Sequence, residues 1–381
     1  MLRLADAFAA RGLAVDLAVG QAKGELRAEV PPGARIVELG KTLVWRATAR
    51  RLVAEPHAWR LLLGLEVRPL KRLWRRLPAL TDYLRSARPN AVLAAEPRYN
   101  AMAIWARRLS RLDCRVVLSE HIHASSHAAG ANPWADRLLL PLLRRAYLQA
   151  DAIVTASLGV ADDLAHLGIS RDRITTVYNP VVAPDLLVKA GEPVDHPWFA
   201  AGEPPVVLGT GRLEPQKDFA ALIRAFAALR SRRPSRLVIV GAGAASEYAV
   251  ALKRLATELG VGHDVELLGF VQNPFAYMSR AAVFALSSRY EGLGNVLIEA
   301  LACGTPVVST DCPSGPREIL QDGQFGPLVP VGDDGALARA IEAVLDDPPP
   351  SERLQARAAR FSVERAVEDY LELLLPAAPS A

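Results

Sequence analysis

The sequence predicts an α/β protein that contains two doubly wound parallel-sheet domains. The length of 381 residues suits two domains of ordinary size. Short apolar strands alternate with helical segments along most of the chain, and a proline-rich polar stretch interrupts the alternation near the middle. We therefore predict domains over residues 1–180 and 205–350, a linker over 181–204, and C-terminal helices with a frayed tail over 351–381.

The first predicted domain opens with an amphipathic helix. Residues 2–11 place Leu4, Ala5 and Phe8 on one helical face, and Gly12 ends the helix. Apolar segments typical of strands follow, with helices between them. We expect these strands at residues 14–19, 35–39, 91–95, 115–119, 152–155 and 174–177.

The second predicted domain repeats the alternation, which indicates a second parallel sheet. A helix is expected from about Asn295, whose side chain can cap it. Gly315 followed by Pro316 predicts the start of a short helix, and a last helix is expected over residues 361–375. The strands are expected at residues 205–211, 236–240, 265–268, 283–286, 306–308 and 327–329.

The net charge of +4 is unevenly distributed along the chain. Residues 1–180 carry 27 Lys and Arg against 16 Asp and Glu, a net charge of +11, whereas residues 181–381 carry 18 against 25, a net charge of −7. The segment Arg68–Arg76 is basic and contains Trp74, which suits contact with an anionic membrane surface or a solvated helix face. Nucleic-acid binding is not favoured, because no recognition motif accompanies the charge.

The sequence indicates a protein of the reducing cytoplasm. No apolar run is long enough to span a membrane, and Asp6 and Arg11 interrupt what would be the apolar region of a signal peptide. The cysteines, Cys114, Cys303 and Cys312, lack metal-site spacing and are best interpreted as structural thiols. With the basic first half, this predicts peripheral association with the inner face of the plasma membrane.

The most distinctive pattern is SSRYEGLGNVLIEALACGTPVVSTDCPSGPREIL, residues 287–320. Glu291 and Glu299 are separated by a glycine-broken loop and an apolar run. The glycines allow a ligand to approach the backbone closely, and free N–H groups at a helix start suit an anion such as a diphosphate. Because Glu291 precedes the helix and Glu299 lies inside it, we expect the two carboxylates to bind separate parts of one extended polar ligand.

A second pattern, GTGRLEPQKDF, begins at the end of a predicted strand. Arg212 offers a planar fork of donors and Lys217 a compact charge, and together they suit a diphosphate. The alternative is a pair of surface charges. The glycines at 209 and 211 are no dinucleotide fingerprint, because the third glycine is missing.

Together these motifs resemble the donor site of retaining glycosyltransferases of family 4, which have the GT-B fold of two Rossmann-like domains facing a cleft. The family's E-x7-E motif matches Glu291 and Glu299, and its glycine-arginine-lysine element matches Gly211, Arg212 and Lys217. The resemblance covers about residues 2–375 and is strongest over 205–320. It implies that the last helix crosses back onto the first domain.

The resemblance also implies roles for individual residues. Glu299 is expected to bind the ribose hydroxyls of a nucleotide sugar, and Glu291 is expected to face the transferred sugar. Backbone groups at Val271 are expected to hold the base. The backbone groups expected at the diphosphate belong to Leu293, Gly294 and Asn295.

A histidine cluster, SEHIHASSH, follows a predicted strand end, where ligand clefts open in α/β sheets. In the family a histidine in the corresponding loop faces the donor sugar, and Glu120-His121 is the best match. The alternative is a satisfied polar group at a strand end, which is how we interpret His123 and His127. The chain has no Asp-x-Asp, so we expect chemistry that needs neither a metal ion nor another cofactor.

These patterns predict a retaining glycosyltransferase that moves a sugar from a nucleotide sugar, in particular a UDP-sugar, to a glycan or polyprenyl-linked acceptor. The segment CPSGPREIL, residues 312–320, resembles bacterial members that build lipid-linked oligosaccharides, capsule or O-antigen. One alternative is a sugar-nucleotide epimerase on the same fold. Another is a truncated, non-catalytic protein that binds nucleotide sugars.

The start of the sequence differs from the family pattern. Family members begin with a strand and a glycine-rich loop, whereas here the first element is the helix at residues 2–11. We therefore expect the given sequence to lack the first strand of the N-terminal sheet. The neighbouring strands would then lose a ladder partner, and the first domain would be loosened.

Overall fold

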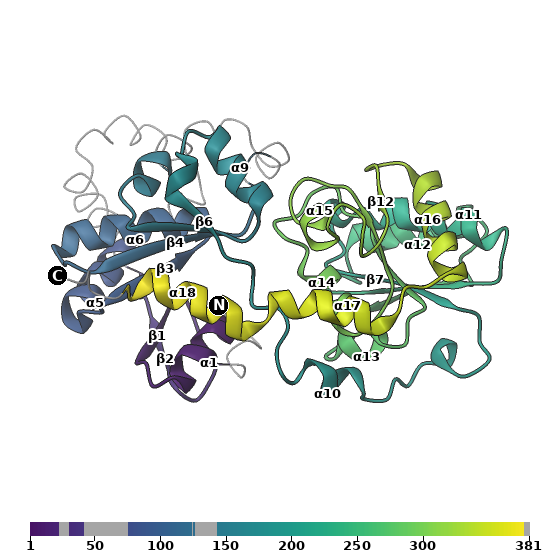
Figure 1. The fold of residues 1–381 in the computed structure, drawn as a ribbon, viewed down its shortest axis with the longest axis horizontal. Helices are drawn as coiled ribbons and strands as arrows, with labels where there is room; N and C mark the ends of the chain where they lie inside the picture. The colour runs from purple at the N-terminus through teal and green to yellow at the C-terminus, as the bar shows by residue number, and fades with distance from the viewer. Residues whose placement is uncertain (23–29, 42–74, 124, 126–142, 377–381) are drawn as a thin grey trace. The chain divides into compact units, whose positions relative to one another are not determined.

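The computed structural model describes residues 1–22, 30–41, 75–123, 125 and 143–376 (Figure 1). The chain forms two compact units, and each has its own parallel strands and its own helices. The first unit comprises Met1–Pro180 and Val363–Ala381, and the second comprises Val181–Ser362. The chain therefore passes between the units twice, at residues 180–181 and at residues 362–363.

The strands of the first unit are divided between two sheets. β1 and β2 pair in parallel with each other, and β3, β4, β5 and β6 form a separate parallel sheet in that order. Within the described residues, no ladder joins these two sheets, whereas the alternation predicted a single one. The strands are β1 (Val15–Val19), β2 (Ala34–Glu38), β3 (Ala91–Ala95), β4 (Arg115–Glu120), β5 (Ala152–Thr155) and β6 (Ile174–Thr176).

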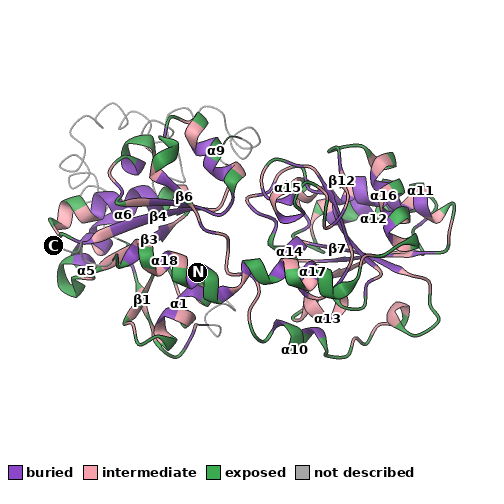
Figure 2. Cartoon of the chain, in the orientation of Figure 1, coloured by how far each residue is buried: buried purple, intermediate pink, exposed green. Residues whose placement is uncertain are grey.

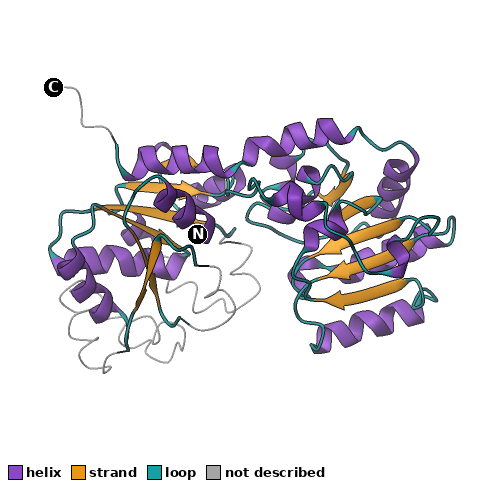
Figure 3. Ribbon diagram, turned by 90° about the horizontal axis from the view of Figure 1, so that it is seen from below, coloured by secondary structure: helices purple, strands orange, loops and turns teal. Residues whose placement is uncertain are grey.

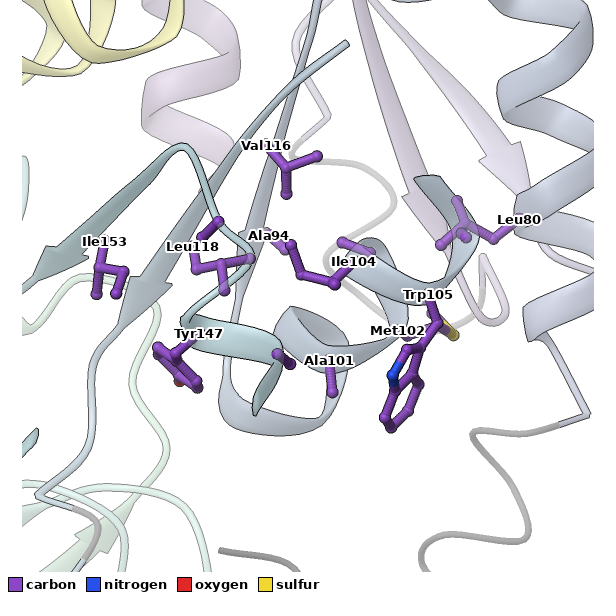
Figure 4. Close-up of a cluster of buried hydrophobic side chains, with 14 of the residues drawn as sticks. Leu80, Ala94, Ala101, Met102, Ile104, Trp105, Val116, Leu118, Tyr147 and Ile153 are labelled. Atoms are coloured by element: carbon purple, nitrogen blue, oxygen red, sulfur yellow. The ribbon is translucent and has the colours of Figure 1, made fainter. Parts of the chain in front are cut away.

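Apolar side chains of the strands and helices form the core of the first unit. Ile104 and Trp105 of α6 belong to the same buried cluster as Leu118 of β4 and Ile153 of β5 (Figure 4). Helix α9 begins at a serine cap, because Ser157 accepts a hydrogen bond of 3.1 Å from a backbone N–H in the first turn. The helices are α1 (Leu2–Ala10), α5 (Leu77–Ala87), α6 (Pro97–Ser110), α9 (Leu158–His166) and α18 (Val363–Leu374).

The second unit contains one six-stranded parallel sheet in the order β12-β11-β10-β7-β8-β9. Its central strands are buried along their whole length, as Figure 2 shows. Long apolar runs are typical of parallel strands that are covered on both faces. The strands are β7 (Val206–Thr210), β8 (Arg236–Val240), β9 (Val265–Gly269), β10 (Val283–Leu286), β11 (Val307–Thr310) and β12 (Leu328–Val329).

Helices cover both faces of this six-stranded sheet (Figure 3). Helices α11 and α16 pack against each other, and each begins at an aspartate whose side chain accepts a backbone N–H. The helices are α10 (Leu186–Ala190), α11 (Phe219–Arg230), α12 (Glu247–Glu258), α13 (Pro274–Met278), α14 (Asn295–Ala302), α15 (Pro316–Ile319), α16 (Asp334–Asp346) and α17 (Ser351–Ala358).

The boundaries of the two units differ from the predicted domain boundaries. Residues 181–204, expected to be a linker, lie in the second unit and include α10. Helix α17 also belongs to the second unit, whereas α18 packs against β3, β4 and α1 of the first. Within the second unit, the two connecting segments are hydrogen-bonded to each other: the backbone N–H groups of Val181 and Val182 donate to the carbonyl of Phe361.

Among the described residues, no helix is both long enough and apolar enough to cross a lipid bilayer. Most of the basic segment 68–76 lies outside the described residues, and only its last two arginines are placed.

Candidate functional site

The sequence motifs of the second unit meet where its strand order reverses. β7 lies between β8 and β10, so the chain connections lead away from this point in opposite directions along the sheet. In open parallel sheets, ligands bind at such a point, beyond the carboxyl ends of the strands. Lys217 follows β7 and Glu291 follows β10. The fold therefore brings both motifs to the side of the sheet formed by the carboxyl ends of its strands.

Lys217 and Glu291 form a buried ion pair. The Lys217 Nζ lies 2.6 Å from the Glu291 Oε1, and the Ser288 hydroxyl donates to the same oxygen over 2.7 Å. Only 14% of the lysine side chain and 8% of the glutamate side chain are exposed. Burial of both charges is costly unless they are paired and hydrogen-bonded, and both conditions are met here.

The loop that carries Lys217 is bound to the loop that carries Glu291. The Ser287 hydroxyl donates to the Lys217 carbonyl over 2.8 Å, and the Gln216 side chain donates to the Tyr290 carbonyl over 2.9 Å. These bonds link residues about seventy positions apart in the sequence. They fix the position of the ammonium group relative to the carboxylate.

The glycine of the second motif makes room for the lysine. A Cβ atom at Gly211 would lie 3.1 Å from the Lys217 Cε, which is tighter than an ordinary contact. A Cβ at Gly241, at the end of β8, would lie only 1.7 Å from the Gly211 carbonyl oxygen. Glycine is therefore required at position 241, and the two strand ends approach more closely than larger residues allow.

Arg212 lies on the surface, one residue after Gly211. Its side chain is 66% exposed and donates to the Glu214 Oε1 over 2.9 Å. An exposed pair of this kind contributes little to stability, so an incoming anion could recruit the guanidinium at small cost.

Helix α14 begins at Asn295 as predicted, but its cap differs from the prediction. Gly294 is the N-cap, with a left-handed φ of 92°, and no side chain caps the helix. The prediction that Asn295 caps it is wrong, because the turn at Gly294 places Asn295 inside the first turn, where it is exposed. The N–H groups at a helix start suit an anion. Leu293 is buried before the cap, and Glu299 is half-buried further along the helix.

The loop before α15 closes against the Glu291 loop. The Glu291 backbone N–H donates to the Pro313 carbonyl over 3.2 Å, and α15 begins at Pro316 as predicted. Burial, together with the nearby Glu291 carboxylate, raises the pKa of the Cys312 thiol to about 12. Burial also raises the pKa of Cys303 to about 12. Thiols with such pKa values stay protonated and unreactive at neutral pH.

The expected base-binding position follows β9. Val271 is half-buried, and the preceding Phe270 is 69% exposed. The Gly241 backbone N–H donates to the Gly269 carbonyl over 2.8 Å, which ties this strand end to the end of β8.

His121 lies in the first unit, directly after β4, and both of its ring nitrogens have partners. The Nδ1 lies 3.0 Å from the Asn179 Oδ1, and the Nε2 lies 2.9 Å from the Ser119 Oγ. Burial lowers the pKa of His121 to about 4, so the ring is neutral at pH 7. Among the described residues, no three His, Cys, Asp or Glu side chains are grouped as metal ligands would be.

Glu120, beside this histidine, is almost completely buried. Its Oε2 accepts a hydrogen bond of 2.5 Å from the Tyr147 hydroxyl, and its Oε1 accepts the backbone N–H groups of His121 and Ile122. Burial raises the pKa of Glu120 to about 7, although these hydrogen bonds favour the ionised form.

Because their pKa values shift in opposite directions on folding, Glu120 and His121 should make the free energy of unfolding depend on pH with opposite signs. Folding raises the Glu120 pKa from 4.5 to about 7, so this group's stabilisation is lost as pH rises through that window. Folding lowers the His121 pKa from 6.5 to about 4, so its contribution is lost as pH falls from 6.5 to about 4. Each slope reaches at most about 1.4 kcal/mol per pH unit, and the two offset each other where the windows overlap.

We expect Glu120→Gln to remove the Glu120 contribution, so that the difference from the wild type isolates it. The variant should gain stability relative to the wild type as pH rises from 4.5 to 7, measured as the urea midpoint at a series of pH values. Glu258→Gln, on the exposed face of α12, is the control and should show a far smaller pH-dependent difference. A Glu120→Gln difference that is independent of pH would contradict the assignment.

Sequence reasoning missed several residues around these sites. Ser288 lies inside the quoted pattern, three residues before Glu291, but nothing in that pattern marks it as a partner of the carboxylate. Tyr147 lies in a helical segment without a distinguishing signal. Glu120 had one usable signal, since a carboxylate at the end of an apolar strand needs partners when it is buried.

Comparisons with known proteins match nearly the whole chain. The family described as "Glycosyltransferase Family 4" matches residues 1–183, and "Glycosyl transferases group 1" matches residues 195–361. N-acetylgalactosamine-N,N'-diacetylbacillosaminyl-diphospho-undecaprenol 4-alpha-N-acetylgalactosaminyltransferase of Campylobacter jejuni is 32% identical over 312 residues, which are 80% of this chain and 79% of that protein. A lipopolysaccharide core biosynthesis glycosyltransferase of Rhizobium meliloti is 34% identical over 60% of this chain and 65% of its own length.

Solved structures agree on the fold. HepE of Anabaena, crystallised in complex with UDP, superposes with a TM-score of 0.75 over 98% of this chain and 94% of its own, at 18% identity. The lipopolysaccharide outer core galactosyltransferase WaaB superposes with a TM-score of 0.63 over 80% of each chain, at 22% identity. With its two parallel-sheet α/β units and matches to both family descriptions, this chain belongs to the family 4 glycosyltransferases of the GT-B fold.

Proposed function

We propose that this protein is a retaining glycosyltransferase that moves a sugar from a UDP-sugar to a hydroxyl of a glycan or polyprenyl-linked acceptor in cell-surface polysaccharide synthesis. The observation that carries the proposal is the buried Lys217–Glu291 pair at the point where the strand order reverses. Fixed charges at that point suit a diphosphate and the hydroxyls of the attached sugar.

In this proposal the second unit stabilises the leaving group. The diphosphate gains negative charge as the bond to the sugar breaks, and donors that are already in place lower the energy of that charge. Lys217 supplies a fixed ammonium group, and the exposed Arg212 supplies a guanidinium that can turn toward the diphosphate. The start of α14 at Gly294 supplies backbone N–H groups.

Glu291 positions the sugar and does not attack it. Its Oε1 already accepts hydrogen bonds from Lys217 and Ser288, which orient the carboxylate. The acceptor hydroxyl attacks from the face that the diphosphate leaves, and its proton passes to the departing phosphate oxygen. No protein base is then needed. Glu299 binds the ribose hydroxyls, and His121 faces the sugar.

The comparisons support the choice of substrates by similarity. HepE of Anabaena was crystallised with UDP, which supports a uridine nucleotide. The name of the Campylobacter jejuni relative describes an undecaprenyl-diphosphate-linked acceptor, which supports a lipid-linked glycan.

Transfer assays with panels of UDP-sugars and GDP-sugars test the proposal. Each donor is incubated with polyprenyl-diphosphate-linked glycans, and nucleotide release and labelled lipid are measured together. We expect UDP release that depends on the acceptor and matches the sugar incorporated. Conversion of the donor into another sugar nucleotide without acceptor would instead indicate an epimerase.

We also propose that the protein associates peripherally with the inner face of the plasma membrane through its basic first half. The support is the net charge of +11 over residues 1–180 and the basic segment ending at Arg75 and Arg76. Replacing Arg72, Arg75 and Arg76 with Gln should reduce co-sedimentation with anionic vesicles, and raised salt should do the same to the wild type. Binding that is insensitive to both changes would refute this interaction.

A further inference from the structure

We infer that Asn179, Ser119 and Tyr370 are positioning residues that hold the His121 ring in one orientation and one tautomer. The inference rests on the proposed function, because it concerns the histidine assigned to the donor sugar. All four residues belong to the first unit, but they come from three separate parts of the sequence.

Three short contacts connect these side chains in a chain. The Asn179 Oδ1 lies 3.0 Å from the His121 Nδ1, the Ser119 Oγ lies 2.9 Å from the Nε2, and the Tyr370 hydroxyl lies 2.8 Å from the Ser119 Oγ. Ser119 is completely buried and Tyr370 is 1% exposed. In such surroundings each polar group depends on its protein partner, because water does not replace it.

The amide oxygen of Asn179 and the neutral state of the ring together fix the direction of every bond. An amide oxygen only accepts, so Asn179 requires the proton of the neutral ring to be on Nδ1. The unprotonated Nε2 then accepts from the Ser119 hydroxyl. The Ser119 oxygen in turn accepts from the Tyr370 hydroxyl. A doubly protonated ring would satisfy the same contacts with the other two bonds reversed. Burial lowers the pKa of His121 to about 4, so the ring is neutral at pH 7 and its single proton is on Nδ1.

The backbone of the histidine is held as firmly as its ring. The His121 N–H donates to the Glu120 Oε1 over 3.1 Å, and Glu120 is itself fixed by the Tyr147 hydroxyl. A histidine held at both its backbone and its ring has little freedom to reorient. A group that must present one face to a substrate benefits from such preorganisation.

Two of the positioning residues lie on the segments that connect the units. Asn179 is two residues before Val181, the first residue of the second unit. Tyr370 lies on α18, which begins at Val363 and packs against β3 and β4. Asn179 therefore contacts His121 from one of the segments that connect the two units, and Tyr370 contacts Ser119 from the other.

Kinetics and nitrogen NMR of the full chain test this inference. Asn179→Ala removes the acceptor, and Asn179→Asp keeps an oxygen acceptor in its place. Tyr370→Phe removes the hydroxyl at the far end of this series of hydrogen bonds. Tyr83→Phe is the matched control, because it removes a tyrosine hydroxyl that bonds to Asp16 in the same unit. The ring nitrogens of His121 are assigned by the signals that disappear in His121→Asn.

We expect the wild type to show a protonated Nδ1 and an unprotonated Nε2. Asn179→Ala should give a mixture of tautomers and lower kcat on the order of tenfold, with little change in the KM of the donor. Asn179→Asp should retain the Nδ1 proton and recover most of the lost turnover. Tyr370→Phe should lower kcat less than Asn179→Ala, and Tyr83→Phe should leave both readouts unchanged.

A proton on Nε2 in the wild type would overturn the inference. Unchanged kcat in Asn179→Ala, with only a lower melting temperature, would also overturn it by showing that the contact is merely structural. Full turnover in His121→Asn would refute the positioning inference and the role given to His121, but not nucleotide-sugar transfer. If the wild type transfers no sugar, the proposed function fails, and the tautomer measurement alone decides the bond directions.

Discussion

Replacing Lys217 with Met should lower turnover on the order of 10²- to 10³-fold. Lys217 is the buried, fixed positive charge beyond the carboxyl ends of the second unit's strands, and loss of a preorganised charge-stabilising group typically costs that much. The measurement is steady-state kinetics with saturating donor and acceptor. Lys253→Met, on the surface of α12, is the matched control and should keep full turnover.

A second variant separates catalysis from folding. Loss of one partner of a buried ion pair can cost about 3–5 kcal/mol, because the other charge is left uncompensated. Combining Lys217→Met with Glu291→Gln removes that stranded charge, and the Gln side chain can still accept from Ser288. The double variant should recover stability but not turnover. Recovery of turnover as well would show that Lys217 acts only through stability.

Glu299→Ala and Glu291→Gln should separate affinity from turnover. Glu299 lies inside α14, where we assign it to the ribose, so its loss should weaken nucleotide-sugar binding. A lost charged hydrogen-bond partner costs about 1.5–3 kcal/mol, or about 10- to 150-fold in affinity. Glu291→Gln should instead mainly lower kcat, because this carboxylate is assigned to the transferred sugar.

Calorimetric titration of the donor and steady-state kinetics on both variants give the two quantities. Glu258→Ala, on the exposed part of α12, is the control and should alter neither quantity. Unchanged affinity in Glu299→Ala together with unchanged turnover in Glu291→Gln would remove the site assignment.

Much of the fold could be predicted from local patterns. The strands of the second unit lie within about two residues of their predicted limits, because buried parallel strands are continuous apolar runs between polar or glycine residues. The short helix at Pro316 was also predictable, because proline is well suited to a first turn. The two motifs indicated a shared ligand, and the structure brings Lys217 and Glu291 together.

The remaining features depend on geometry that local patterns do not contain. Asn295 has the usual chemistry of a cap, but Gly294 can adopt the left-handed conformation and is the N-cap in its place. The contact between Ser119 and Tyr370 joins residues 251 positions apart, and neither belongs to a motif. The division of the first unit's strands into two sheets depends on strand pairing, which alternation alone does not specify.

The anomeric configuration of the product tests the central claim most directly. The wild-type protein is supplied with an α-linked UDP-sugar and a polyprenyl-linked acceptor, and the new glycosidic bond is examined by proton NMR. Attack from the face that the diphosphate leaves, with Lys217 and Glu291 in the roles assigned here, predicts an α-linked product. A β-linked product would contradict the account, because it requires attack from the opposite face and a protein base to activate the acceptor.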